Sequence, residues 1–264
     1  MQLRRWMLLL LLSPAMANAG GSPYTLRWSV DGPLAGAAAG FSALSLALRS
    51  SAEPLTPDEI AALSADDINA FDRGATTNRS GGAATASDVL VWTMVASPLL
   101  LLGNDAVRAD AGTVGAMYLE VLALSAAIPP AVKELTHRAR PYVYNPAVPL
   151  DEKTTPEAHR SFFSQHATFA FSSAVFLSTV YGDFNPDSKW TPYIWAGSLA
   201  AAGAVAWLRV EAGQHFPTDV IAGAAVGAAI GWLVPALHRT GDDGLSSTAV
   251  PRAGGFTLAV RYSF

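Results

Sequence analysis

The sequence contains no cysteine among its 264 residues. This absence excludes disulfide bonds, thiolate chemistry and zinc sites built on cysteine. Charge is also scarce, because only 14% of the residues are Asp, Glu, Lys or Arg, against roughly 25% in a typical soluble domain. The formal net charge of −4 argues against nucleic acid as a partner, since such a protein needs a basic face. The low charge instead indicates a membrane protein or a very apolar helical core.

The N-terminus has the pattern of a secretory signal peptide. A pair of arginines precedes an apolar run over 6–12, and an Ala-Asn-Ala sequence that ends at Ala19 follows. We therefore predict a signal peptide over residues 1–19, with cleavage after Ala19. The alternative is an uncleaved membrane anchor, but the apolar run is shorter than the ~20 residues that a spanning helix needs. The prediction implies export, to the periplasm or the cell membrane.

Residues 20–84 form a mixed region before the longest apolar stretches. The segment 32–48 carries no charge and is either a short membrane segment or a buried helix. Thr56 and Glu59 match a capping box, with proline at the first helical position, and predict one or two short amphipathic helices. Small and polar residues dominate 74–87, which predicts a flexible loop.

Five apolar stretches with almost no charge follow, separated by polar loops, and they predict the helices of one bundle. They cover 89–104, 111–132, 161–182, 190–208 and 220–237. Pro129 and Pro130 should kink or interrupt the second stretch near its end. Gly223, Gly227 and Gly231 are spaced by four residues and predict a smooth face for close helix packing.

These patterns define an all-α fold class, with an apolar helical-bundle domain over 85–240. Residues 241–264 form a C-terminal tail, and 256–264 alternate in the manner of a β-strand. The apolar stretches fit either a membrane-embedded bundle or a very apolar soluble core, and we expect membrane association. If the signal peptide is cleaved and 32–48 does not span, the polar residues after 132 face the outside, which suits an exported enzyme.

A first polar cluster follows the second apolar stretch. In a helix, Lys133, His137 and Arg140 would lie at i, i+4 and i+7, on one face. Two cations on an apolar helix are costly unless they meet an anion. Phosphate suits this place, because Arg can bind two of its oxygens while Lys acts as a point charge. The alternatives are an ordinary solvated helix end and a membrane-surface anchor.

A second polar cluster opens the third apolar stretch. The N-terminus of a helix binds anions through its unpaired N–H groups and its dipole. Ser164 adds a hydroxyl at this place, and His166 can serve as an acid near neutral pH. A lone histidine here can equally be structural.

The third polar cluster connects the last two apolar stretches. Arg209 closes one helix, and His215 opens the next. Asp219 follows His215 by four residues, so its carboxylate can reach an imidazole nitrogen. Such a bond selects the tautomer and leaves the other nitrogen available for attack. The alternative is that the His–Asp pair simply caps a helix.

Three spaced motifs, Lys-x6-Arg-Pro, Ser-x-His and Arg-x5-His-x3-Asp, occur in this order along the chain. Their combination resembles the type-2 phosphatidic acid phosphatase and vanadium haloperoxidase superfamily. The residues on motif positions are Lys133, Arg140, Pro141, Ser164, His166, Arg209, His215 and Asp219. The resemblance covers about 130–220 for the motifs and roughly 85–240 for the helical layout. It implies a helical bundle with a metal-free phosphate site that hydrolyses a phosphorylated lipid or a soluble organic phosphate.

The resemblance also implies a role for each catalytic residue. His215 would attack phosphorus and form a phosphohistidine, with Asp219 orienting its ring. His166 would protonate the leaving oxygen and then activate water. No metal or organic cofactor is implied, and vanadate, which imitates the phosphoryl transition state, would act as an inhibitor.

The implied phosphate ligands are Lys133, Arg140 and Arg209, with help from Ser164 and Gln165. They would stabilise the charge that develops in the transition state. The family usually has Pro-Ser-Gly-His where this chain has Phe-Ser-Gln-His, and it usually has serine where Leu stands before the third-motif arginine. Gln165 either crowds the phosphate or adds an amide donor.

Two other functions fit the same residues. One is a vanadate-dependent haloperoxidase, in which vanadate would be the cofactor on the same ligands. The other is a non-catalytic binder of a lipid or of phosphate, in which the changes at Gln165 and Leu208 mark a degenerate site. Oxidation of halide in the presence of vanadate and peroxide would identify the first, and the absence of phosphate release would favour the second.

Overall fold

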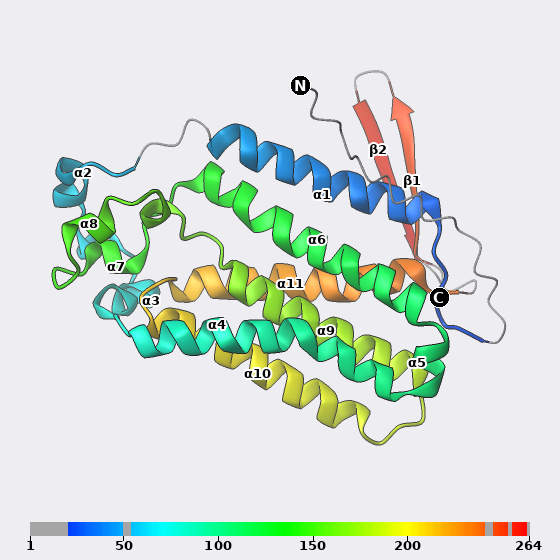
Figure 1. Cartoon of the computed structure of the whole chain (residues 1–264). Helices are drawn as coiled ribbons and strands as arrows, with labels where there is room; N and C mark the ends of the chain where they lie inside the picture. The colour runs from blue at the N-terminus through cyan, green and yellow to red at the C-terminus, as the bar shows by residue number, and fades with distance from the viewer. Residues whose placement is uncertain (1–20, 50–53, 241–244, 253–254, 263–264) are drawn as a thin grey trace, which may run out of the picture.

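The computed structural model of the chain describes residues 21–49, 54–240, 245–252 and 255–262. Its long helices lie side by side in one bundle (Figure 1). They are α1 (Trp28–Arg49), α4 (Gly81–Ala96), α6 (Ala111–Thr136), α9 (Gln165–Phe184), α10 (Thr191–Glu211) and α11 (Pro217–His238). The predicted signal peptide over 1–19 lies outside the described residues.

Short helices occupy the connections, and a hairpin follows the bundle. The short α-helices are α2 (Pro57–Ala62), α3 (Ala70–Arg73), α5 (Asp105–Ala109), α7 (Pro141–Tyr144) and α8 (Leu150–Lys153). The 3-10 helices are η1 (Ala65–Asp67), η2 (Gly74–Thr77), η3 (Ser97–Gly103) and η4 (Pro156–His159). In the tail, β1 (Leu245–Arg252) pairs antiparallel with β2 (Gly255–Tyr262). The expected all-α bundle with a β-like tail is confirmed.

The short helix α2 begins as its sequence predicts. The Thr56 N–H donates to Glu59 Oε2 at 2.8 Å, and the Glu59 N–H donates to Thr56 Oγ1 at 3.3 Å. Each side chain thereby satisfies a main-chain N–H that the first turn of the helix leaves without a partner. The prediction of a capped helix at this point is confirmed.

The loop expected over 74–87 is wrong in its second half. Helix α4 begins at Gly81, and the Ser80 hydroxyl accepts a hydrogen bond from the Ala83 N–H at the start of that helix. The serine is an effective N-cap, and the alanines that follow have a high helix propensity, so the small residues extend the helix.

Of the kink or interruption expected at Pro129 and Pro130, the interruption does not occur, because α6 continues to Thr136. A proline nitrogen carries no hydrogen, so the carbonyl four residues earlier loses its helical donor. For Pro130 that carbonyl belongs to Ala126. The Gln165 side-chain amide donates to this oxygen at 3.3 Å, so a residue of α9 replaces the missing hydrogen bond.

The glycine row of α11 packs directly on α9, as its spacing predicts. A Cβ atom at any of the three positions would collide with a main-chain carbonyl oxygen of α9. The distances would be 2.4 Å from Gly223 to Ser164, 2.3 Å from Gly227 to Thr168 and 2.3 Å from Gly231 to Ser172. Both sets repeat every four residues, so the two helices approach closely along two turns.

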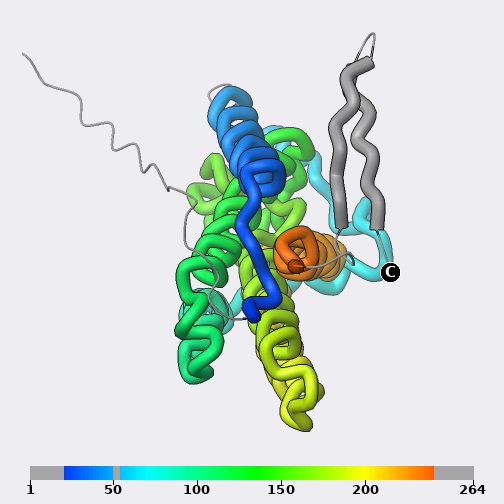
Figure 2. Tube along the Cα trace, turned by 90° about the vertical axis from the view of Figure 1, so that its right-hand side faces the viewer, coloured from blue at the N-terminus to red at the C-terminus, as the bar shows by residue number. Residues whose placement is uncertain are grey.

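Helix α9 lies at the centre of the bundle and contacts α4, α6, α10 and α11. Viewed from the side turned by 90°, α1 and α10 lie on opposite sides of it (Figure 2). Side chains of α6, α9 and α11 form the main apolar core. Its fully buried members include Met117, Val121, Phe176, Val180 and Val234. The 32–48 segment is part of α1, which packs along α6.

Four helical segments are long and apolar enough to cross a membrane. They are Gly81–Gly103, Ala111–Tyr144, Thr191–Glu211 and Pro217–His238. Large apolar side chains also point outward from the bundle and stay exposed. Examples are Trp92, Leu99, Leu100, Leu119, Tyr193 and Trp207. A protein surrounded only by water rarely exposes so many, so these features indicate a membrane-associated bundle.

Candidate active site

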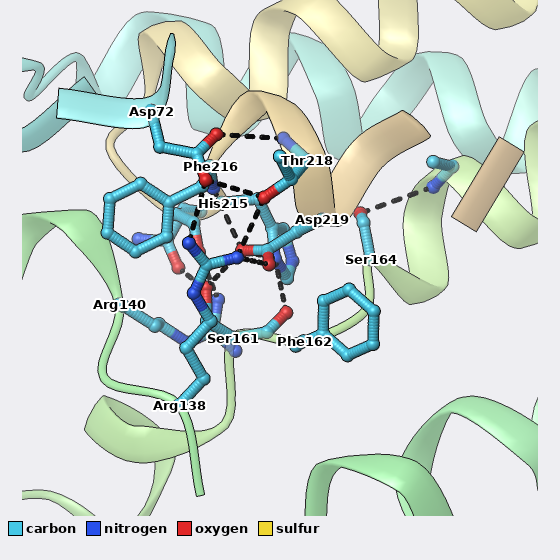
Figure 3. Close-up of polar contacts among 12 residues, drawn as sticks. Asp72, Arg138, Arg140, Ser161, Phe162, Ser164, His215, Phe216, Thr218 and Asp219 are labelled. Carbon is cyan, nitrogen blue, oxygen red and sulfur yellow. Dashed lines mark hydrogen bonds and ion pairs between the residues drawn. The ribbon is translucent and has the colours of Figure 1, made fainter. Parts of the chain in front are cut away.

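The three polar clusters expected from the sequence meet at one end of the bundle. His215, in the α10–α11 connection, contacts Ser161, which lies just before α9. Arg140, which follows α6, contacts Gln214 in the same connection. The close-up in Figure 3 shows these segments converging on His215. The structure therefore brings together residues that lie more than 70 positions apart in the sequence.

His215 is almost completely buried, with 1% of its side chain exposed. Its Nδ1 lies 2.8 Å from the main-chain oxygen of Ser161. A carbonyl oxygen can only accept, so Nδ1 carries the hydrogen. In the neutral ring the lone pair then lies on Nε2.

Asp219 does not bond directly to the imidazole, and the predicted bond is corrected here. Its Oδ2 lies 3.7 Å from His215 Nδ1. Other donors satisfy the carboxylate, namely the Phe216 N–H at 2.9 Å, the Ser161 hydroxyl and the Arg138 guanidinium at 2.6 Å. Asp219 therefore fixes both segments that hold the histidine, while the carbonyl of Ser161 selects the tautomer.

Arg138 and Asp72 extend this network, and sequence reasoning missed both. The two nitrogens of the Arg138 guanidinium bridge two buried carboxylates, Asp219 at 2.6 Å and Asp72 at 2.8 Å. Asp72 also accepts from the main-chain N–H of Thr218 at 3.0 Å, from its hydroxyl at 2.6 Å and from Asn69 at 2.9 Å. The short helix α3 is thereby joined to the first turn of α11.

Asp72 is an anion in this network. Burial raises its pKa, but the hydrogen bonds from Thr218, Arg138 and Asn69 outweigh burial and bring the pKa below the ordinary value. Arg138 also lies over the Phe216 ring, with its central carbon 4.2 Å from the ring centre. The sequence signal for Asp72 is only the Asn cap before it, which is typical of any helix start.

Lys133, His137 and Arg140 do not share a helix face, so that prediction is wrong. Helix α6 ends at Thr136, and His137 adopts a left-handed conformation with φ of 44°. Its ring packs against His159, with the ring centres 5.3 Å apart. Lys133 alone stays on the helix, and Arg140 lies in extended backbone beyond it.

Arg140 is nevertheless buried and fixed at the site. Its Nε donates to the main-chain oxygen of Glu157 at 2.8 Å. One terminal nitrogen donates to the main-chain oxygen and the side-chain oxygen of Gln214, at 3.1 and 2.9 Å. These neutral acceptors hold the guanidinium without cancelling its charge, because the nearest carboxylate oxygen is 3.8 Å away, on Glu157.

His166 and Arg209 share a carboxylate that the sequence analysis did not identify. Asp88, on α4, lies 2.8 Å from His166 Nε2 and 3.4 Å from an Arg209 nitrogen. Arg209 also donates to the Ser87 hydroxyl at 3.3 Å. Because a carboxylate accepts, Nε2 of His166 carries a hydrogen. Asp88 thus orients the residue predicted to be the acid and lies beside a predicted phosphate ligand.

Ser164 and Gln165 have structural contacts in this arrangement. The Ser164 hydroxyl caps α9 by accepting from the Ala167 N–H at 3.4 Å, and its side chain is fully buried. The Gln165 amide bonds to the Ala126 carbonyl on α6. Their role as phosphate ligands stays a prediction.

Three cations surround His215. Burial and the positive charges of Arg140, Lys133 and Arg209 hold the pKa of this imidazole well below its ordinary value. Lys133 is 7% exposed, and its side-chain ammonium has no hydrogen-bond or ion-pair partner within the described part of the chain. A buried cluster of like charges is costly unless an anion enters it. The arrangement therefore suits an anion beside a neutral imidazole.

The structure thus combines an apolar helical bundle with buried cationic side chains and an oriented histidine at one end. The family model of the PAP2 superfamily matches residues 115–242 of this chain. The resemblance expected from the three motifs is confirmed. Asp72 and Asp88 lie outside the matched region.

Two solved structures are similar to this chain. Aquifex aeolicus LpxE shares 22% identity, with a TM-score of 0.43 over 61% of this chain and 90% of its own. The first transmembrane PAP2 type phosphatidylglycerolphosphate phosphatase from Bacillus subtilis shares 22% identity, with a TM-score of 0.48 over 79% of this chain and 94% of its own. No curated protein matches the sequence.

Proposed function

We propose that this protein is a phosphatase that hydrolyses phosphate monoesters through a phosphohistidine on His215, without a metal or cofactor at the active site. The proposal rests on one observation: the neutral, oriented imidazole of His215 lies near three cationic side chains, those of Lys133, Arg140 and Arg209. A phosphoryl group needs its oxygen charge neutralised and an attacking atom in line with the leaving oxygen. Cationic side chains meet the first need, and His215 Nε2 meets the second.

In the first step, the lone pair of His215 Nε2 forms a bond to phosphorus, and the bond to the leaving oxygen breaks. Protonated His166, whose Nε2–H stays on Asp88, gives its Nδ1 hydrogen to that oxygen, which leaves as an alcohol. The ring of His215 then carries positive charge. Its Nδ1–H stays on the Ser161 carbonyl, and the Asp219 carboxylate at 3.7 Å stabilises the charge.

In the second step, His166 accepts a proton from water as the water oxygen bonds to phosphorus. The bond between phosphorus and His215 Nε2 breaks, which restores the neutral imidazole and releases inorganic phosphate. Burial and the positive charge of Arg209 lower the pKa of His166 to about 4, which favours the neutral ring that accepts this proton. Asp88 acts in the opposite direction and stabilises the protonated form that the first step uses.

The substrate class that fits best is a lipid phosphate. The site lies at the ends of α6 and α11, which belong to segments long and apolar enough to cross a membrane. A lipid held in the bilayer would present its headgroup at that level. We propose that the site faces the periplasm or the outside of the cell, because the N-terminal sequence has the pattern of an export signal.

The test is phosphate release by the purified protein in detergent, with EDTA present. Phosphatidic acid and a soluble aryl phosphate would be compared, and vanadate would be added as an inhibitor. His215→Gln should lose at least about 10³-fold in kcat, because it removes the nucleophile. His159→Gln is the matched control, since His159 is also buried but lies outside the motifs.

Activity in EDTA that disappears only in His215→Gln supports the proposed mechanism. Preference for phosphatidic acid supports the lipid substrate, whereas preference for the aryl phosphate overturns that part alone. Equal activity in wild type and His215→Gln would exclude a phosphohistidine at this residue.

A further inference from the structure

A second polar cluster lies at the other end of the bundle. It consists of Asp31 on α1, Glu120 on α6 and His238 at the end of α11. One donor atom from each side chain lies within 4.8 Å of the others. The side chain of His238 is fully buried, and those of Asp31 and Glu120 are 26% and 16% exposed.

The hydrogen-bond geometry leaves three acceptors facing one another. His238 Nδ1 lies 2.8 Å from the main-chain oxygen of Val234, so Nδ1 carries the hydrogen of the neutral ring. Nε2 then presents its lone pair to Asp31 Oδ1 at 2.8 Å and to Glu120 Oε2 at 3.5 Å. Glu120 Oε2 is buried and has no hydrogen-bond partner within the described residues. A proton on Nε2 would satisfy Asp31 at hydrogen-bond distance, whereas a metal ion between the three atoms would satisfy Glu120 Oε2 as well.

We propose that Asp31, Glu120 and His238 bind a divalent transition-metal ion of the Zn²⁺ type. The donor set of one imidazole nitrogen and two carboxylate oxygens suits such an ion. Metal bonds of ~2.0–2.2 Å place tetrahedral donors about 3.3 Å apart, and the observed separations of 2.8 and 3.5 Å lie on either side of that value. The bond from Nδ1–H to Val234 is the arrangement by which proteins orient a metal-binding histidine.

This site is separate from the active site. Asp219 and His238 lie near opposite ends of α11, and 19 residues of helix at 1.5 Å each separate them by about 30 Å. The ion would join α1, which lies outside the matched family region, to two helices of the bundle. Its effect is therefore on stability and on the docking of α1, and the phosphatase step does not need it.

The test uses the full chain in detergent, stripped with a chelator and then desalted. Zn²⁺ binding is measured as metal content per chain and as the rise in thermal midpoint. Co²⁺ serves as a second probe, because its visible absorption reports nitrogen and oxygen ligands. Asp31→Asn and His238→Gln change the proposed ligands. Asp183→Asn is the control, since Asp183 is a carboxylate near the same end of the bundle that pairs with Arg239.

The expected result is one equivalent of Zn²⁺, a higher thermal midpoint, and at least a tenfold loss of affinity in Asp31→Asn and His238→Gln but not in Asp183→Asn. No binding by folded wild type would overturn the proposal and leave a proton as the shared cation. Equal binding by wild type and Asp31→Asn would also overturn it. If His238→Gln does not fold, the isosteric Asp31→Asn variant decides. Phosphate release by the stripped protein is a separate readout, so failure of this proposal leaves the proposed phosphatase mechanism untouched.

Discussion

Replacing Arg138 with glutamine should damage both stability and catalysis, although the side chain has no place among the proposed phosphate ligands. Arg138 donates to Asp219 and to Asp72, and both carboxylates are fully buried. A hydrogen bond to a charged group contributes about 1.5–3 kcal/mol, and removing one partner of a buried ion pair costs about 3–5 kcal/mol. We therefore expect Arg138→Gln to lose about 3–5 kcal/mol, a fall of about 10 °C in the thermal midpoint.

The assay combines thermal unfolding in detergent with steady-state phosphate release. Because Arg138 positions His215 through Asp219, kcat should fall while KM stays within about twofold. The double variant Asp72→Asn with Arg138→Gln removes one unpaired carboxylate, so it should be less destabilised than the sum of the single variants. The reasoning would be refuted if the free energy of unfolding of Arg138→Gln lies within about 0.5 kcal/mol of the wild-type value and the loss in the double variant equals the sum of the losses in the single variants.

Three further predictions concern other contacts. Burial and neighbouring cations lower the pKa of His215 below its ordinary 6.5, so its neutral form persists as pH falls, and the acid limb of kcat/KM should lie below pH 6.5. Lys133→Met removes one of these cations and should move that limb to higher pH. An unmoved limb would contradict the assignment of the limb to His215. Gly227→Ala places a Cβ 2.3 Å from a carbonyl oxygen and should cost about 1–3 kcal/mol in thermal unfolding, whereas Gly203→Ala, which meets nothing within 4 Å, should be neutral or stabilising. Gln165→Ala should lower the free energy of unfolding by about 1 kcal/mol, because the Ala126 carbonyl loses its donor, and it should leave KM unchanged. A higher KM with unchanged stability would instead identify Gln165 as a phosphate ligand.

Local patterns predicted the helices well and their boundaries less well. The five apolar stretches correspond to α4 with η3, α6, α9, α10 and α11. The prediction failed where a distant residue changes the local outcome. Pro130 does not interrupt α6, because Gln165 supplies a hydrogen bond to the carbonyl that the proline leaves without a donor. The helical face proposed for His137 failed because the chain leaves the helix there with a positive φ, which no residue spacing reveals.

The sequence by itself determined the apolar helices, the close packing of the glycine row of α11 on α9, and the three motifs that resemble those of the PAP2 superfamily. These features depend on side-chain type at short spacing, which the chain carries locally. Only the tertiary structure decided which nitrogen of His215 carries the lone pair, because the acceptor that holds the other nitrogen is the Ser161 carbonyl, 54 positions away. It also decided that Asp72 and Arg138 support Asp219. A buried charge is stable only beside its partners, and those partners come together only when the bundle is complete.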